Sequence, residues 1–230
     1  MECTAKQTDD PMKAIIRAVL TLTILLCVLA TGAQGSPASG SSVFTYRRIF
    51  KSSTPEFIEI KINEDSDTAS YEIRQLDEDP GATPFQVSSA IRARIFQLAA
   101  QLNEFKGLDL DVHRKIANLG AKTFRWEHGS EAYEVTFNYT VNPEATELLQ
   151  ICEGLARQQE LIDLLQRRMK YDRLGVNDAL LELETDFTKG VLPEPKRVLP
   201  LLDQISDDSR FVEIARERAR SLAERIRHSN

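Results

Sequence analysis

Alternating apolar and polar residues predict five β-strands in the N-terminal and central parts of the chain. The predicted strands cover residues 43–51, 56–62, 70–76, 122–127 and 131–141. The apolar face of the last strand carries Tyr133, Val135, Phe137, Tyr139 and Val141. Glu134, Thr136 and Asn138 alternate with these residues and point the other way. Such a pattern is typical of an antiparallel sheet that packs one face on the core and leaves the other in water.

Apolar residues spaced three or four apart predict two helices that cover the apolar face of this sheet. The first spans about residues 88–105 and separates the two groups of strands. The second spans about residues 142–171, with Asn142 as its N-cap and Pro143 at its first position. The pattern therefore predicts an α+β fold with helices packed on an antiparallel sheet.

The C-terminal part of the chain, residues 172–230, contains only helical patterns. Three shorter helices are predicted there, with a kink at Pro200 and with Asp207 or Asp208 as the cap of the last one. We expect residues 43–171 to form the α+β domain. The C-terminal helices are expected to form a region that is packed on this domain or hinged from it.

An export signal is predicted at the N-terminus. Lys13 and Arg17 precede an apolar run over residues 18–30, which is long enough for a signal peptide but shorter than the roughly 20 residues that cross a bilayer. Small residues follow this run. They predict cleavage by a signal peptidase after Ala33 or Gly35.

Two features of this segment leave alternatives open. Residues 1–35 are a signal peptide if they are cleaved, which we favour, whereas residues 14–33 anchor the protein in the inner membrane if they are retained. The polar and partly acidic residues before Met12 do not suit a signal peptide, so we expect translation to start at Met12. In each case the remaining chain reaches the periplasm or the extracellular space, where residues 36–42 form a flexible leader.

Charge and cysteine content narrow the function classes. The 230 residues carry a formal net charge of −6, whereas proteins that bind nucleic acids normally carry an excess of basic residues. We therefore expect no nucleic-acid partner. Of the three cysteines, Cys3 and Cys27 lie in the export segment, so Cys152 alone belongs to the exported chain. Cys152 lies on the apolar stripe of a predicted helix and is expected to be a buried thiol rather than a nucleophile.

One short segment offers metal ligands. Asp109, Asp111 and His113 occur at alternate positions, so an extended backbone would present all three on one face. The alternative, which we favour, is a polar loop in which Asp111 caps a short helix that follows. The chain contains no motif for a phosphate loop, a dinucleotide or a catalytic zinc ion, and we expect no cofactor and no metal.

The last predicted helix is rich in arginine. Its candidates for an interaction surface are Arg216, Arg220 and Arg227. A basic amphipathic helix of this kind can bind an anionic partner or a membrane surface. Each of the three arginines, however, follows a glutamate by three residues, at Glu213, Glu217 and Glu224. We therefore favour a solvent-exposed helix face on which each of these arginines forms an ion pair with a glutamate of the same helix.

Three strand segments and a helix occur in an order that resembles a known group of proteins. The segments read FTYRRIFK at residues 44–51, KTFRWE at residues 122–127 and EVTFNYT at residues 134–140, with a helix over residues 91–105 between the first and the second. Together they resemble small exported bacterial α+β proteins that have no assigned activity. The resemblance covers about residues 43–167. It implies an α+β fold and a location in the cell envelope, and it supplies no catalytic residues.

The sequence favours binding over catalysis. The export signal, and the lack of a recognisable set of nucleophile, base and electrophile, predict a non-catalytic domain of the cell envelope that binds a partner protein or a ligand. Contact with a membrane is expected only through the N-terminal segment, if that segment is retained. The alternative is a hydrolase of envelope material whose carboxylates are brought together by the fold, for instance Glu127, Glu131 and Glu134.

Overall fold

The fold is built on one antiparallel β-sheet of six strands. The computed structural model describes residues 40–229. The strands are β1 (Val43–Ile49), β2 (Phe57–Asn63), β3 (Thr68–Arg74), β4 (Thr83–Gln86), β5 (Ala121–His128) and β6 (Glu131–Phe137). Their order in the sheet is β4-β3-β2-β1-β5-β6, so the central strand β1 lies between β2 and β5. The predicted export segment and its cleavage positions, Ala33 and Gly35, lie outside the described residues.

Five α-helices accompany the sheet in the described part of the chain. They are α2 (Ser89–Gln101), α3 (Pro143–Tyr171), α4 (Val176–Thr188), α5 (Leu199–Asp207) and α6 (Glu213–Arg227), with short 3-10 turns η1 (Asn103–Phe105) and η2 (Pro195–Val198). Helix α3 begins as predicted, because Asn142 Oδ1 accepts a hydrogen bond from the Ala145 backbone N–H at 2.8 Å. The predicted α+β class, with a helical C-terminal region, is confirmed.

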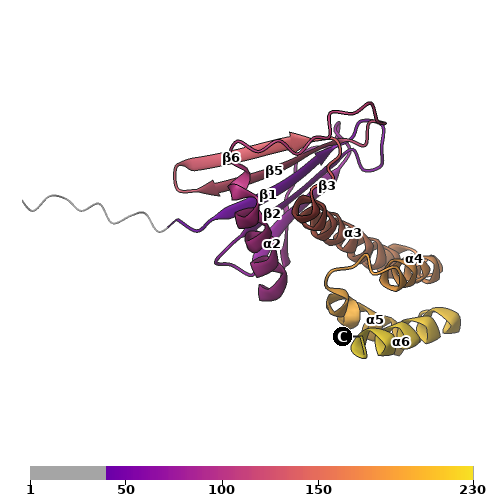
Figure 1. The fold of residues 1–230 in the computed structure, drawn as a ribbon. Helices are drawn as coiled ribbons and strands as arrows, with labels where there is room; N and C mark the ends of the chain where they lie inside the picture. The colour runs from indigo at the N-terminus through magenta and orange to yellow at the C-terminus, as the bar shows by residue number, and fades with distance from the viewer. Residues whose placement is uncertain (1–39, 230) are drawn as a thin grey trace, which may run out of the picture. The chain divides into compact units, whose positions relative to one another are not determined.

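Helices α2 and α3 cover one face of the sheet, and α4 to α6 pack against α3 from its other side (Figure 1). The core between the sheet and the helices is centred on Phe124, whose side chain is fully buried. Four rings surround it, with centroid distances of 5.2 to 6.0 Å. They belong to Phe44, Tyr46, Phe105 and Phe137.

Helix α3 contributes to two hydrophobic cores. Its N-terminal half buries Leu148 and Cys152 against the sheet and α2, whereas its C-terminal half buries Leu161 and Leu165 against α4, α5 and α6. The prediction that Cys152 is a buried thiol is confirmed. Burial raises the pKa of this thiol well above its usual value, which makes it a poor nucleophile.

A chain of polar groups joins the two cores. Gln158 in the middle of α3 is fully buried, and its Oε1 accepts a hydrogen bond from the Glu194 backbone N–H at 3.1 Å. The Glu194 carboxylate in turn accepts one from the Ser88 backbone N–H, at the start of α2, at 2.8 Å. Arg197 Nε also donates to this carboxylate, at 2.9 Å. Three segments that are far apart in the sequence are thereby tied together.

The prediction that the last strand extends to Val141 is wrong, because β6 ends at Phe137. The Asp111 carboxylate accepts hydrogen bonds from the backbone N–H groups of Asn138 and Tyr139 at 3.1 and 3.2 Å, which draws the chain out of the sheet. Tyr139 and Val141 are consequently 46% and 69% exposed, although the alternation places them on the buried face.

Three further differences concern local signals. Residues 111–118 form no helix, so Asp111 caps none and binds the exit of β6 instead. The N-cap of α6 is Val212, and the Asp208 carboxylate binds Arg210 rather than the helix start. Pro200 causes no kink, because the helix begins at Leu199 and the proline lies in its first turn, where its missing N–H leaves no bond unmade.

Candidate functional site

The three residues that the sequence offers as candidate metal ligands, Asp109, Asp111 and His113, do not converge. His113 Nε2 and Asp109 Oδ2 form a 2.6 Å contact on the surface, whereas the Asp111 carboxylate turns to the end of β6. The hydrogen bond with His113 lowers the pKa of Asp109 and raises that of His113. Within residues 40–229, no group of three His, Cys, Asp or Glu side chains is placed to hold a metal ion.

The arginines of α6 mainly hold the helical layer together. Arg216 pairs with Glu213 in its own helix at 2.6 Å, but Arg227 pairs with Asp203 of α5 rather than with the glutamate three residues earlier. Arg218 and Arg225, which the sequence analysis did not select, both bind Glu184 of α4, at 2.7 and 2.5 Å. Arg220 is exposed and has no ion pair among the described residues. Of the three predicted arginines, Arg220 alone keeps its charge fully available.

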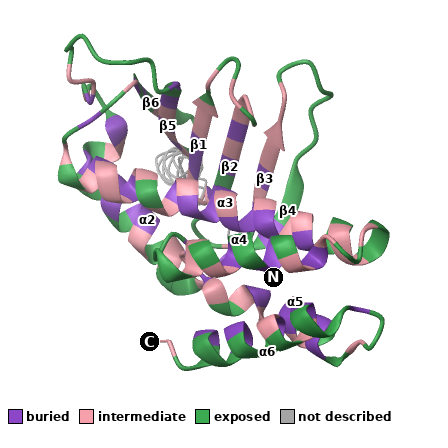
Figure 2. Ribbon diagram, turned by 90° about the vertical axis from the view of Figure 1, so that its right-hand side faces the viewer, coloured by how far each residue is buried: buried purple, intermediate pink, exposed green. Residues whose placement is uncertain are grey.

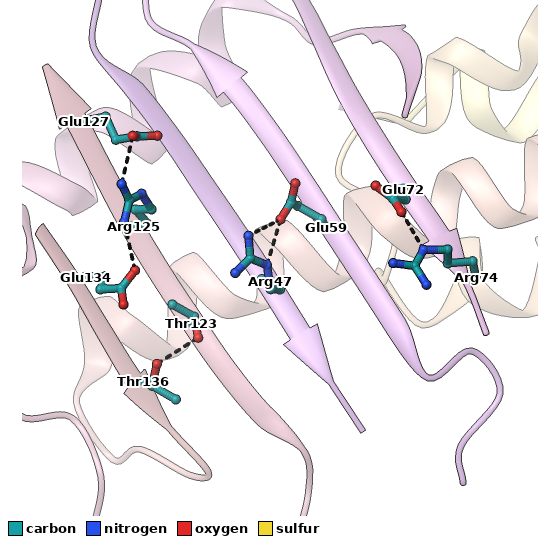
Figure 3. A network of polar contacts seen from close by, with 9 residues as sticks. All are labelled: Arg47, Glu59, Glu72, Arg74, Thr123, Arg125, Glu127, Glu134 and Thr136. Carbon is teal, nitrogen blue, oxygen red and sulfur yellow. Dashed lines mark hydrogen bonds and ion pairs between the residues drawn. The ribbon is translucent and has the colours of Figure 1, made fainter. Parts of the chain in front are cut away.

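Two carboxylates of the hydrolase alternative, Glu127 and Glu134, lie on the open face of the sheet, whereas Glu131 lies on the same side of β6 as Tyr133 and Val135. Glu127 and Glu134 share one guanidinium, that of Arg125, with both nitrogen–oxygen distances at 3.0 Å (Figure 3). The hydrogen bond from Arg125 lowers the pKa of Glu127, so this carboxyl is held in its charged form. Glu131 is exposed at the start of β6.

The rest of the open face is polar and internally paired. Arg47 Nε donates to Glu59 at 2.8 Å, and the Thr123 and Thr136 hydroxyls lie 2.8 Å apart (Figure 3). A third ion pair joins Arg74 to Glu72 across 2.5 Å. The charges that Figure 3 shows are thus matched within the sheet.

A cleft lies on the opposite side, between the strand ends and α3, which crosses the strands (Figure 2). One stripe of α3, with side chains spaced three or four residues apart, lines this α3 cleft. The stripe consists of Leu149, Glu153, Arg157, Glu160, Leu164 and Arg167. Three hollows of about 560, 620 and 460 Å³ follow one another along it. Neighbouring hollows share lining residues, Glu153 between the first two and Glu160 between the last two, so the hollows form one elongated depression.

Gly154 of α3 allows the segment after α4 to pack close to the helix. This segment forms the second wall of the central, 620 Å³ hollow. A Cβ added at Gly154 would lie 2.5 Å from the Val191 carbonyl oxygen and 2.9 Å from two ring atoms of Pro193. Only glycine lets the segment after α4 approach the helix so closely. Lys189 and Val191 of this segment consequently line the central hollow.

Arg48 is a largely buried charged group of the central hollow that the protein satisfies only in part. Its side chain lies on the face of β1 that α3 covers and is 22% exposed. The nearest carboxylate oxygen, on Glu153, is 3.9 Å from Nη1, beyond hydrogen-bond distance. The Nε atom is enclosed and has no hydrogen-bond acceptor among the described residues. A buried donor without an acceptor costs about 1–3 kcal/mol, and such a group requires an explanation.

The groups around Arg48 are held by the protein itself. The Tyr46 hydroxyl donates to Glu153 Oε1 at 3.2 Å, and burial raises the pKa of Tyr46 well above its usual value. The buried Lys122 Nζ donates to the carbonyl oxygens of Leu119, Gly120 and Asn138, at 3.0, 3.3 and 3.0 Å. Burial lowers the pKa of Lys122, while its three carbonyl partners favour the charged form. Lys122 therefore shapes the wall of the 560 Å³ hollow, whereas Arg48 faces the central hollow without a close acceptor among the described residues.

Glu160, a side chain of this cleft, makes the stability of the protein depend on pH. Burial raises the pKa of Glu160 above 4.5, although Arg157 lies 3.6 Å away, because Arg157 also binds Asp186 at 2.7 Å and Glu182 at 3.1 Å. Asp163 adds a like charge nearby. Because the folded-state pKa is raised, the unfolded chain ionises first and stability falls as the pH rises from 4.5 through the folded-state pKa.

We therefore expect Glu160→Gln to raise the unfolding free energy at neutral pH and to flatten its pH dependence above pH 4.5. The measurement is urea unfolding of both proteins at a series of pH values. The same substitution at Glu131, which is exposed and lies outside the cleft, is the matched control. A wild-type stability that stays constant over this pH range would contradict the prediction.

Sequence reasoning missed Arg48 and Lys122 as site residues, although a signal for both exists. Arg48 follows Phe44 and Tyr46 at alternate positions, and Lys122 precedes Phe124 and Trp126 in the same way. Each therefore occupies an inward position of an apolar strand face, where a charge is expensive unless it is paired or used.

Comparison with known proteins identifies no relative: no protein-family model and no curated protein matches this chain. Across residues 40–229, no helix is both long enough and apolar enough to cross a membrane.

Proposed function

We propose that this chain is a non-catalytic binding domain of an exported protein and that the α3 cleft holds an anionic group of its ligand. The observation that carries the proposal is Arg48, whose guanidinium lies in the wall of the central hollow without a hydrogen-bond acceptor for Nε. The N-terminal sequence pattern supports export.

The chemistry of Arg48 selects the class of ligand. A guanidinium presents its donors as a planar fork that matches a carboxylate or phosphate with two parallel hydrogen bonds. The 620 Å³ of the central hollow falls within the range of about 300–1,000 Å³ that is usual for small-ligand sites. A carboxylate or phosphate group placed there would accept hydrogen bonds from the terminal nitrogens of Arg48 and would take the place of the distant Glu153 as its partner.

The proposal predicts that Arg48→Gln weakens anion binding by about tenfold to one hundredfold, because a charge-assisted hydrogen bond contributes about 1.5–3 kcal/mol. Isothermal titration calorimetry with citrate and with inorganic phosphate measures this effect. Arg47→Gln is the matched control, because Arg47 is the next residue of β1 and its side chain pairs with Glu59 on the open face. Equal affinities of the wild type and Arg48→Gln, or a wild type that binds neither anion, would overturn the proposal.

The stability of the Arg48 variants separates a binding role from a structural one. Arg48 Nε makes no hydrogen bond to any residue from 40 to 229, so Arg48→Met should leave the unfolding free energy unchanged or raise it. A residue that is kept for ligand binding and not for the fold shows this combination of lost affinity and retained stability. Denaturant unfolding of the same preparations used for calorimetry gives the comparison.

A hydrolase is the second candidate, and one observation favours it. Glu153 and Glu160 line the same hollow, and burial raises the pKa of Glu160 as a general acid requires. Glu160→Gln distinguishes the two functions. In a binding domain this variant should bind citrate several-fold more tightly at neutral pH, because it removes a negative charge near the anion. In a hydrolase it should abolish turnover in a screen of glycoside, ester and peptide substrates.

A further inference from the structure

The α3 cleft is longer than the ligand site at Arg48. A fourth hollow, of about 330 Å³, continues the line of the other three, and Arg167 is common to it and its neighbour. The cleft therefore follows α3 from Leu149 to Lys170. At a rise of 1.5 Å per residue this is a path of about 30 Å, which an extended peptide of about nine residues would fill. Such a shape suits a chain molecule better than a compact metabolite.

The charges along this path favour an acidic ligand. Arg48, Arg167, Lys170 and Lys189 line the hollows, and the last three make no ion pair among the described residues. The acidic side chains of the path, in contrast, already have partners in the protein. Asp163, for example, accepts a hydrogen bond from the Tyr71 hydroxyl at 2.7 Å. The cleft thus offers unpaired positive charge in a chain whose formal net charge is −6, which favours an acidic ligand there.

One end of the path is apolar. Leu119, Tyr139 and Val141 are 45%, 46% and 69% exposed and line the 560 Å³ hollow together with Leu149. Exposed apolar side chains that surround a hollow mark a place where a partner buries an apolar side chain. A polysaccharide or nucleic acid with uniform charge would leave this end unused. A peptide carries acidic and apolar side chains in one chain, and this combination matches both parts of the cleft.

We infer that the ligand of the α3 cleft is an extended acidic peptide segment of a partner protein, with an apolar side chain in the hollow at Tyr139 and acidic side chains along Arg48, Lys189 and Arg167. This inference rests on the proposed function, because it takes the anionic group at Arg48 to be one side chain of that peptide. Beyond the proposed function, the inference specifies the length of the ligand, its class as a peptide, and the apolar side chain at one of its ends.

The test uses fluorescence anisotropy with a labelled ten-residue peptide that carries four glutamates and a leucine–phenylalanine pair at one end. We expect this peptide to bind at least about tenfold more tightly than citrate, and its affinity to fall as salt is added. Replacement of the glutamates by glutamine should abolish binding, and replacement of the apolar pair by serine should weaken it about tenfold. The double variant Arg167→Gln/Lys170→Gln, which changes two residues of the outer hollows and none of the central one, should weaken peptide binding about tenfold while leaving citrate binding unchanged.

Arg220→Gln is the matched control for charge, because Arg220 is an exposed arginine of α6 that does not line the cleft. An equal loss of peptide affinity in this control would overturn the inference, since binding would then follow total charge. Tighter binding of a sulfated polysaccharide than of the peptide would also overturn it and would assign the cleft to a glycan. If citrate binding depends on Arg48 but the peptide binds no better than citrate, the inference fails alone. If neither binds, the proposed function fails as well.

Discussion

Phe124→Ala should lower the free energy of unfolding by about 3–5 kcal/mol, the usual loss for a large aromatic side chain in a core. Phe124 lies on β5 beside the central strand, is fully buried, and is within 6.0 Å of four other rings, measured between centroids. Its removal leaves a space between the sheet, α3 and η1 that these rings cannot fill without leaving their own contacts. Urea unfolding followed by circular dichroism measures the loss.

Thr123→Ala is the control for Phe124→Ala. Thr123 is the neighbouring residue of β5, but its hydroxyl binds Thr136 on the exposed face of the sheet (Figure 3). Its replacement should cost less than about 1 kcal/mol, since an exposed hydrogen bond contributes little net stability. Similar losses in the two variants would mean that the helices do not cover the face that carries Phe124.

Lys122→Met is expected to have the second largest effect, a loss of about 2–4 kcal/mol. Lys122 Nζ is the donor for three backbone carbonyl oxygens, and a buried acceptor that loses its donor costs about 1–3 kcal/mol. Methionine keeps the length and apolar volume of the side chain, so the loss reports the hydrogen bonds rather than a cavity. Denaturant unfolding gives this value.

The same substitution tests the link between Lys122 and the apolar hollow. The carbonyl groups of Leu119 and Asn138, which Lys122 holds, belong to residues that line this hollow. The variant should therefore lose the affinity that the apolar pair of the acidic peptide contributes, while its affinity for citrate at Arg48 changes little. Lys61→Met, on the exposed surface of β2, should change neither property. A stable Lys122→Met protein with unchanged peptide affinity would rule out this role for the lysine.

The elements that could be predicted from the sequence are those whose signals are local. The start of α3 is set by Asn142 and Pro143, and the alternation in β5 and β6 assigns their faces. Strand β4 was missed because its four residues include Pro84 and bury only Phe85, which is too short a pattern to read. The early end of β6 could not be predicted, since it depends on hydrogen bonds that the backbone of Asn138 and Tyr139 donates to Asp111, a residue remote in sequence.

The candidate site was less predictable for the same reason. Helix ion pairs were expected between residues three apart, yet Glu184 receives two arginines from 34 and 41 residues away. The inward positions of Arg48 and Lys122 can be read from alternation, but the cleft itself exists only because α3 crosses the strand ends. A sequence reports which side chains face inward, whereas the hollow between two elements depends on how closely they approach, as at Gly154.

The sharing of α3 between two cores has a consequence for cooperativity. The C-terminal helices can separate from the rest only if Leu161 and Leu165 become exposed and two hydrogen bonds break, from the Glu194 N–H to Gln158 and from the Ser88 N–H to the Glu194 carboxylate. These losses raise the free energy of a state in which only the C-terminal helices are unfolded. We therefore expect the sheet and the C-terminal helices to unfold as a single thermodynamic unit. Free energy gained from a ligand that lies along α3 is therefore distributed over both layers, and the whole described chain is protected when the cleft is filled.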